Sequence, residues 1–134
     1  MSTLYYINGS DHQIIWKLSC HNRPSTFECV DGLDFAMQHD ARILSENATH
    51  TVVSIFNNGR NDEEIWQEAS SAMHLVIDHR LQVARSLLQF ESPGDKSLAA
   101  TSQGSKSYED DTRAVVFVLT NSLITNCYQT ATCL

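Results

Sequence analysis

Positive charge is scarce in this sequence of 134 residues. Its 9 lysines and arginines stand against 16 aspartates and glutamates, which gives a formal net charge of −7. An acidic surface repels phosphate backbones and anionic lipid headgroups. No basic run interleaved with aromatic residues offsets this balance. The composition therefore argues against nucleic acid or an anionic membrane as the main partner.

Long apolar runs are also lacking. The longest covers residues 114–119, whereas a membrane-spanning helix needs about 20 apolar residues. Residues 1–7 read as a strand and lack the charged start, apolar core and cleavage site of a signal peptide. We therefore expect no membrane-spanning segment. The compartment stays open, because the sequons at Asn8 and Asn47 would fit a secreted protein.

Several motifs of catalysis and metal binding are missing too. No Gly-rich phosphate loop, Ser/His/Asp arrangement or paired-carboxylate site stands out. Cys20, His21 and Cys29 follow no standard zinc spacing and lack a fourth ligand, so we expect no metal site. Cys20 and Cys29 could be bridged across their loop or remain two free thiols. The sequence leaves the state of Cys127 and Cys133 open.

What is present is a two-residue hydrophobic period. It predicts three pairs of strands, over residues 3–7 with 13–18, 38–44 with 51–56, and 73–77 with 81–90. Residues 62–69 are predicted to be a loop or a single helical turn. The pairs recur roughly every 35–40 residues, close to the ~40–45 residues of a propeller blade. The sequence thus predicts an all-β fold, and a small β-sandwich is the alternative to a propeller.

Four segments carry a resemblance to a known family. They read Ile-Trp-Lys-Leu at residues 15–18, Phe-Ala-Met-Gln-His-Asp-Ala-Arg at 35–42, Val-Ser-Ile-Phe-Asn-Asn-Gly at 53–59, and Ser-Pro followed by Ser-Gln-Gly-Ser within 92–105. Together they resemble the fungal branch of the arylsulfotransferase (aryl sulfate sulfotransferase) β-propellers. The family version of the second and third segments is close to Phe-x-Phe-Gln-His-Asp-Ala-Arg and Ser-Leu-Phe-Asp-Asn-Gly.

The resemblance divides the chain into two parts. Residues 1–105 look like a partial arylsulfotransferase-like β-propeller of about two to three blades, and residues 106–134 look like a divergent tail. Ser-Cys-His-Asn at residues 19–22 replaces a Gly-rich turn, and Asn57 replaces an aspartate. At residues 106–111, Lys-Ser-Tyr-Glu-Asp-Asp replaces a turn of the Leu-Pro-Asn-Gly-Asn type.

The length of the chain poses a physical problem for this fold. A propeller closes a ring of 4–8 blades, and at ~40–45 residues a blade this chain supplies about three. An open arc leaves strand edges unpaired, which favours aggregation. We therefore expect a piece of a longer protein, self-association through open blade edges, or poor folding.

The resemblance implies transfer of a sulfuryl group from an aryl sulfate to a phenol through a histidine intermediate, without cofactor or metal. His39 lies in the matching block and is the candidate nucleophile, because neutral imidazole is a competent nucleophile near neutral pH. The alternative is a structural histidine. Arg42 is a weaker candidate as sulfuryl anchor, because strand alternation turns it away from His39 unless a bulge intervenes. A structural Asp40–Arg42 pair is expected instead.

The other histidines are predicted to be surface or structural residues; they are His12, His21, His50, His74 and His79. A sulfuryl site needs further cationic groups around its oxygens, and we expect these to come from blades that this chain lacks. The hypothesis is therefore that the isolated chain is inactive, so that its status as an enzyme stays open. The second functional hypothesis is a non-catalytic β-propeller module for binding or scaffolding.

Overall fold

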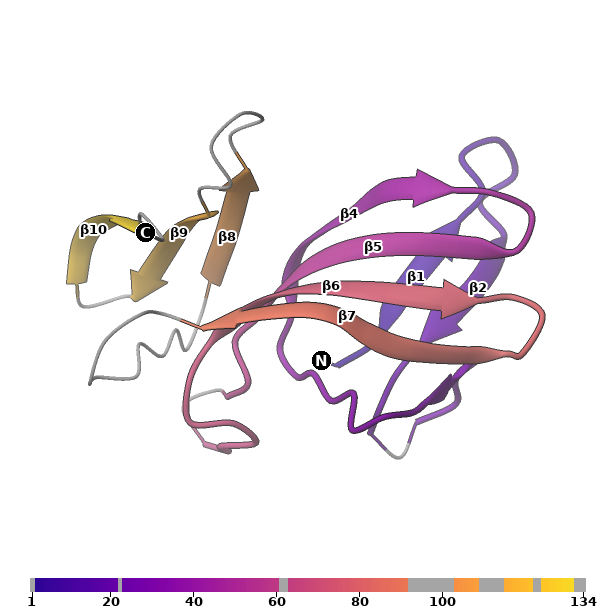
Figure 1. The fold of residues 1–134 in the computed structure, drawn as a ribbon, viewed down its shortest axis with the longest axis horizontal. Coiled ribbons are helices and arrows are strands. Elements are labelled where there is room, and N and C mark those ends of the chain that lie inside the picture. The colour runs from indigo at the N-terminus through magenta and orange to yellow at the C-terminus, as the bar shows by residue number, and fades with distance from the viewer. Residues whose placement is uncertain are drawn as a thin grey trace.

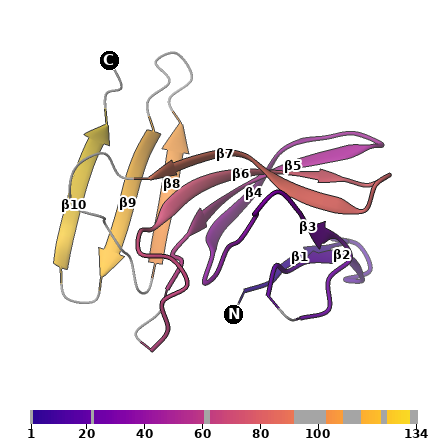
Figure 2. The ribbon, with the colours of Figure 1, turned by 60° about the horizontal axis from the view of Figure 1, so that its bottom comes forward.

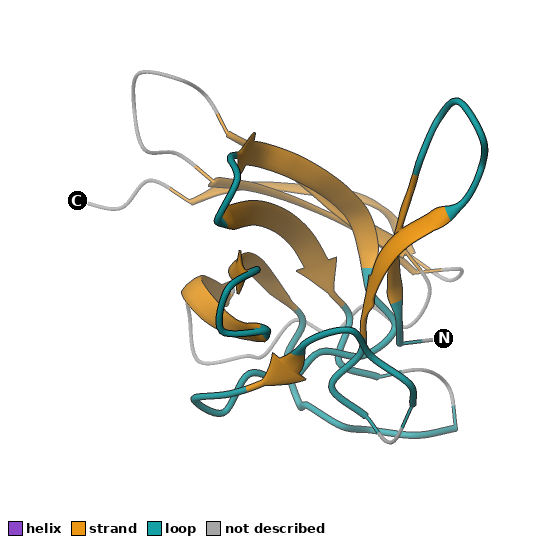
Figure 3. Ribbon diagram, turned by 90° about the vertical axis from the view of Figure 1, so that its right-hand side faces the viewer, coloured by secondary structure: helices purple, strands orange, loops and turns teal. Residues whose placement is uncertain are grey.

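The computed structural model describes residues 2–21, 23–60, 63–91, 103–108, 115–121 and 124–131. These residues form strands and loops only, without a helix (Figure 3). The strands are β1 (Leu4–Ile7), β2 (Ile14–Leu18), β3 (Glu28–Cys29), β4 (His39–Glu46), β5 (His50–Asn57), β6 (Ser71–Asp78), β7 (Val83–Glu91), β8 (Gln103–Tyr108), β9 (Val115–Asn121) and β10 (Ile124–Ala131). The predicted all-β fold is confirmed.

The strands form three sheets, in the orders β1-β2, β3-β7-β6-β5-β4 and β10-β9-β8. Figures 1 and 2 show the β8–β10 sheet at one end of the five-stranded sheet, and the β1–β2 hairpin against one face of its other half, behind the sheet in Figure 1 and below it in Figure 2. The sheets do not close into a ring within the described ranges. This open all-β arrangement is consistent with a partial β-propeller.

All three predicted strand pairs are present as antiparallel hairpins, β1–β2, β4–β5 and β6–β7. The pairs are not separate units, however, because β5 also pairs with β6 along its whole length, from His50 opposite Asp78 to Asn57 opposite Ser71. Strands β4 to β7 therefore form one four-stranded antiparallel meander, which is the strand order of a propeller blade. Short β3 adds to β7 in parallel.

Alternation along β5 and β6 decides where the core lies. Val53 opposes Leu75 and Ile55 opposes Met73, and these four side chains are almost fully buried. Opposed residues share one face of a sheet. They pack against buried side chains of the β1–β2 hairpin and of the loop that follows, which are Leu4, Trp16, Leu18, Phe27, Leu33 and Phe35. One core therefore joins the hairpin to the meander.

A disulfide links Cys20 to Cys29, with their Cα atoms 5.4 Å apart. Of the two states that the sequence left open for this pair, the bridged one is present. Both sulfur atoms are therefore unavailable to a metal ion. The side chains of Cys127 and Cys133 lie outside the described residues.

No helix in the described part of the chain is long and apolar enough to cross a membrane.

Candidate functional site

The chain just before β4 is fixed by bonds to the end of β5. Asn57 Oδ1 accepts a hydrogen bond from the Ala36 amide at 2.9 Å, and the Gly59 amide donates to the Ala36 carbonyl at 3.0 Å. The Gln38 side chain donates to the Thr3 carbonyl at 2.9 Å. The antiparallel register of β4 and β5 thus continues beyond the strands, and this continuation sets the position of the next residue, His39.

A β-bulge follows His39 at once. His39 opposes Phe56 and Arg42 opposes Ser54, with a register shift between the two pairs. Asp40, within the bulge, has a positive φ of 49°. The three steps along β4 from His39 to Arg42 therefore lie opposite only two steps along β5. As a result, the His39 and Arg42 side chains lie on the same face of the sheet. The alternation argument that turned Arg42 away does not apply, because the bulge on which it was conditional is present.

The Arg42 guanidinium nevertheless has a partner of its own. Its Nε lies 2.9 Å from Asp40 Oδ1, and 66% of the Arg42 side chain is exposed. The expected Asp40–Arg42 pair is therefore present. In this arrangement the arginine charge is compensated within β4.

Buried polar atoms of His39 and Asn58, near the start of β4, have no hydrogen-bond partner among the described residues. His39 Nε2 is a buried atom that no described residue bonds, and both side-chain polar atoms of Asn58 are in the same state. Asn58 has no exposed surface at all. Buried polar atoms in native proteins are nearly always paired, so each exception needs an explanation, such as a ligand or water.

Register places these two side chains on one face. Asn58 lies two residues beyond Phe56, which opposes His39, and residues two apart on an extended strand share a face. The preceding Asn57 points to the other face, toward Ala36. His39 and Asn58 are therefore diagonal neighbours, a relation in which Cα atoms are about 7–8 Å apart.

Two further polar residues were missed or discounted on the sequence. Arg60, two residues after Asn58, has a buried Nε that no described residue bonds. His74 opposes Ser54 on β6, and Ser54 in turn opposes Arg42. His74 therefore lies in the same cross-strand row as Arg42. Strand pairing alone brings His74 and Arg42 into one row, and the sequence contains no local signal of it.

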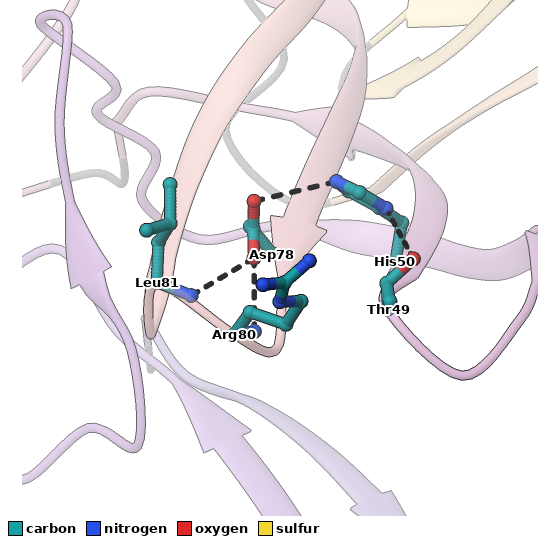
Figure 4. Close-up of a pocket in the computed structure, with 5 residues that line it drawn as sticks. All are labelled: Thr49, His50, Asp78, Arg80 and Leu81. Atoms are coloured by element: carbon teal, nitrogen blue, oxygen red, sulfur yellow. Dashed lines mark hydrogen bonds and ion pairs between the residues drawn. The ribbon is translucent and has the colours of Figure 1, made fainter.

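A second set of polar residues lies at the opposite end of the meander, where the β4–β5 and β6–β7 turns meet (Figure 4). A surface hollow of about 400 Å³ is lined there by Thr49, His50, Asp78, Arg80 and Leu81. His50 Nε2 lies 3.3 Å from Asp78 Oδ2, and His50 Nδ1 lies 2.8 Å from Thr49 Oγ1.

Asp78 is the anchor of this second set. Its Oδ1 accepts hydrogen bonds from the Arg80 and Leu81 amides, both at 2.9 Å. The Leu81 amide is the main reason why the pKa of Asp78 lies below its ordinary value; the Arg80 amide and the His50 charge act in the same direction, and burial opposes them. The carboxylate thus clamps two turns together, which agrees with the predicted structural role of His50.

The hydroxyl, imidazole and carboxylate of this set do not form a hydrolase triad. Thr49 Oγ1 also donates to Asn47 Oδ1 at 2.9 Å. Its proton is therefore directed away from the imidazole, which would have to accept it to activate the oxygen. Among the described residues there is also no group of three or more His, Cys, Asp and Glu side chains that could hold a metal ion.

One protein family matches most of the chain. The model of the arylsulfotransferase (ASST) family matches residues 1–125. The chain belongs to the arylsulfotransferase family. The matched range extends past Ser105, the last residue of the four resembling segments. Neither a curated protein nor a solved structure matches the chain significantly.

One departure of this arylsulfotransferase chain from the resembling motif has a local explanation. Asn57 stands where the motif has an aspartate, and its Nδ2 donates to Gln67 Oε1 at 2.8 Å. Gln67 Nε2 donates in turn to the Asp34 carbonyl at 3.1 Å. A carboxylate could not donate to Gln67. The asparagine therefore suits the glutamine that faces it here.

Proposed function

We propose that this chain carries the nucleophile of a sulfuryl-transfer site, and that the nucleophile is His39. The observation that carries the proposal is the buried, unpartnered Nε2 of His39 in a chain of the arylsulfotransferase family. Family membership supports the reaction class. The open nitrogen supports this particular histidine, because a nucleophile needs a lone pair that no neighbour occupies.

The proposed reaction has two displacements at sulfur. His39 Nε2 attacks the sulfur of an aryl sulfate, the bond from sulfur to the phenolic oxygen breaks, and the phenolate leaves. A second phenol, losing its proton, then attacks the sulfur of the sulfuryl-imidazole, and the N–S bond breaks to regenerate neutral His39. Charge builds on the sulfuryl oxygens, so hydrogen-bond donors must face them.

Asn58 is the proposed donor from this chain. Its amide has no partner in the described part of the chain and no contact with solvent. Its Nδ2 can donate to a sulfuryl oxygen held between it and His39, on the diagonal that the register defines. Preorganised donors of this kind commonly contribute 10²–10³ in rate, about 3–4 kcal/mol.

The isolated chain is proposed to be inactive. Arg42 is compensated by Asp40, so the one guanidinium on β4 is not available to a sulfuryl group. The missing cations would come from a longer polypeptide or from partners that complete the ring. A non-catalytic binding or scaffold module is the alternative, and the Asp40–Arg42 pair is the observation that favours it.

Self-association of the bare chain through an open edge is also proposed. Strand β4 forms one edge of the five-stranded sheet, and Ile43 and Leu44 on it are 43% and 46% exposed. Unpaired, apolar edges recruit other strands. Sedimentation velocity should show concentration-dependent association that Ile43→Lys reduces. A strictly monomeric wild-type chain would contradict this.

The decisive experiment for the function compares two preparations. The first is tagged protein purified from the cells that naturally make it, with any attached or bound segments; the second is the 134-residue chain alone. Both are given an aryl sulfate and a phenol, and product phenol is measured. We expect activity in the first preparation only.

Variants of the native preparation then test the residue. His39→Gln should lower the rate by at least about 10³-fold. The matched control is His12→Asn, because His12 is an exposed turn histidine with a positive φ of 59°, which asparagine also adopts. Activity that survives His39→Gln would refute the assignment of the nucleophile. A native preparation without activity would favour the scaffold.

A further inference from the structure

The tip of the β4–β5 hairpin carries an Asn-Ala-Thr sequon at residues 47–49. Residues 41–48 are all exposed, and the Asn47 amide donates to the His50 carbonyl at 2.9 Å to close the turn. An enzyme that modifies a folded surface or a nascent hairpin can reach such a tip. Accessibility is the first requirement of N-linked glycosylation.

The two polar residues of this sequon are already in contact. Asn47 Oδ1 accepts hydrogen bonds from the Thr49 hydroxyl and the Thr49 amide, both at 2.9 Å, and from the His50 amide at 2.9 Å. The amide oxygen is thus fully engaged, whereas no described residue bonds the amide nitrogen. In glycosylation that nitrogen is the atom that reacts.

The other sequon, Asn-Gly-Ser at residues 8–10, differs in its exposure and in the contact between its two polar side chains. Asn8 is half-buried, and its Oδ1 accepts only from the Ser10 amide, at 2.8 Å. The Ser10 hydroxyl makes no bond to Asn8 in the described structure. Asn47 is therefore the better acceptor.

The disulfide supplies an independent reason to place the chain where glycosylation occurs. Cys20 and Cys29 are bridged in the fold, and structural disulfides form and persist in oxidising compartments such as the secretory pathway. A sequon matters only for a protein that passes through that pathway. The two features occupy different parts of the chain and require the same environment.

We propose that Asn47 carries an N-linked glycan and that Asn8 does not. Asn47 Nδ2 attacks the anomeric carbon of an oligosaccharide bound to a polyprenyl pyrophosphate. The bond from that carbon to the pyrophosphate oxygen breaks, the lipid pyrophosphate leaves, and the amide loses one proton. The glycan lies at the end of edge strand β4 and hinders the approach of another strand to Ile43 and Leu44.

The test uses protein purified from the cells that naturally make it, with and without peptide N-glycosidase. Wild type should lose mass on treatment, and the peptide containing residue 47 should then show aspartate in place of Asn47. Asn47→Gln and Thr49→Val should abolish the loss of mass. Thr49→Ser, which keeps the hydroxyl, and Asn8→Gln should retain it.

The proposal is overturned by wild-type protein without any glycosidase-sensitive mass, or by a loss of mass that persists in Asn47→Gln. The peptide measurement on wild type decides the matter even where Asn47→Gln fails to accumulate. Unmodified Asn47 in that peptide would also overturn the proposal. None of these readouts depends on sulfuryl transfer, so the outcome is independent of the proposed function.

Discussion

Asn57 and Asn58 are adjacent, chemically identical and fully buried, yet removing their side chains should have opposite consequences. Asn57 makes three side-chain hydrogen bonds, to the Ala36 amide, the Gly59 amide and Gln67. Asn58 makes none with any described residue. The pair thus separates the effect of a satisfied buried amide from that of an unsatisfied one at nearly constant position and volume.

The magnitude for Asn57→Ala follows from the groups that lose their partner. The Gly59 amide keeps its bond to the Ala36 carbonyl, and half-buried Gln67 can turn to water. The Ala36 amide, in a residue only 1% exposed, is left unpaired. An unpaired buried group costs about 1–3 kcal/mol, and the cavity and Gln67 add to this. We expect the free energy of unfolding to fall by about 2–4 kcal/mol, a large part of the ~5–15 kcal/mol of a typical domain.

For Asn58→Ala the same reasoning predicts a change of opposite sign in the free energy of unfolding. No hydrogen bond is lost, and two unpaired buried polar atoms are removed, which relieves about 1–3 kcal/mol for each. A small cavity offsets part of this gain. The variant should be within about 1 kcal/mol of wild type or more stable. A residue that weakens the fold and is kept for a site fits the usual opposition between stability and activity.

Guanidinium unfolding followed by far-UV circular dichroism measures both variants, with the slope m compared to confirm that the same transition is observed. Equal destabilisation by the two substitutions would refute the reasoning. So would a larger loss for Asn58→Ala than for Asn57→Ala.

Three further predictions concern stability. Replacing Cys20 and Cys29 by serine should lower the free energy of unfolding by about 2.5–3 kcal/mol, the loop-closure value for a separation of 9 residues; an unchanged midpoint in denaturant would contradict it. Gly59→Ala should cost about 2 kcal/mol or more, because Gly59 has φ +68° and a Cβ there would lie 2.7 Å from Gln67 Cβ; thermal unfolding that matches wild type would rule out this strain. The pKa of Asp78 is lowered from 3.8. The stability that its carboxylate contributes is therefore complete above about pH 4 and is lost as pH falls through the folded pKa. In urea titrations from about pH 5 to pH 2, the free energy of unfolding should fall less steeply with decreasing pH for Asp78→Asn than for wild type.

The local features of the fold were predictable because they depend on neighbours in sequence. Alternating apolar residues and short polar connectors define each hairpin, and register within a hairpin follows from its turn. The union of the second and third hairpins was not predicted. It depends on pairing between β5 and β6 across a loop of irregular structure, and no local period reports such pairing.

The candidate site likewise has some features that the local sequence determines and others that the fold determines. The sequence by itself determined that His39 lies at the start of a strand beside Asp40 and Arg42, because the block that carries these residues is contiguous. The tertiary structure decided how they face one another. A bulge at Asp40 changes the alternation, and a bulge arises from the partner strand as much as from the residues in it. Whether Asn57 or Asn58 finds partners was likewise decided by Ala36 and Gln67, which lie far from them along the chain and reach them only through the fold.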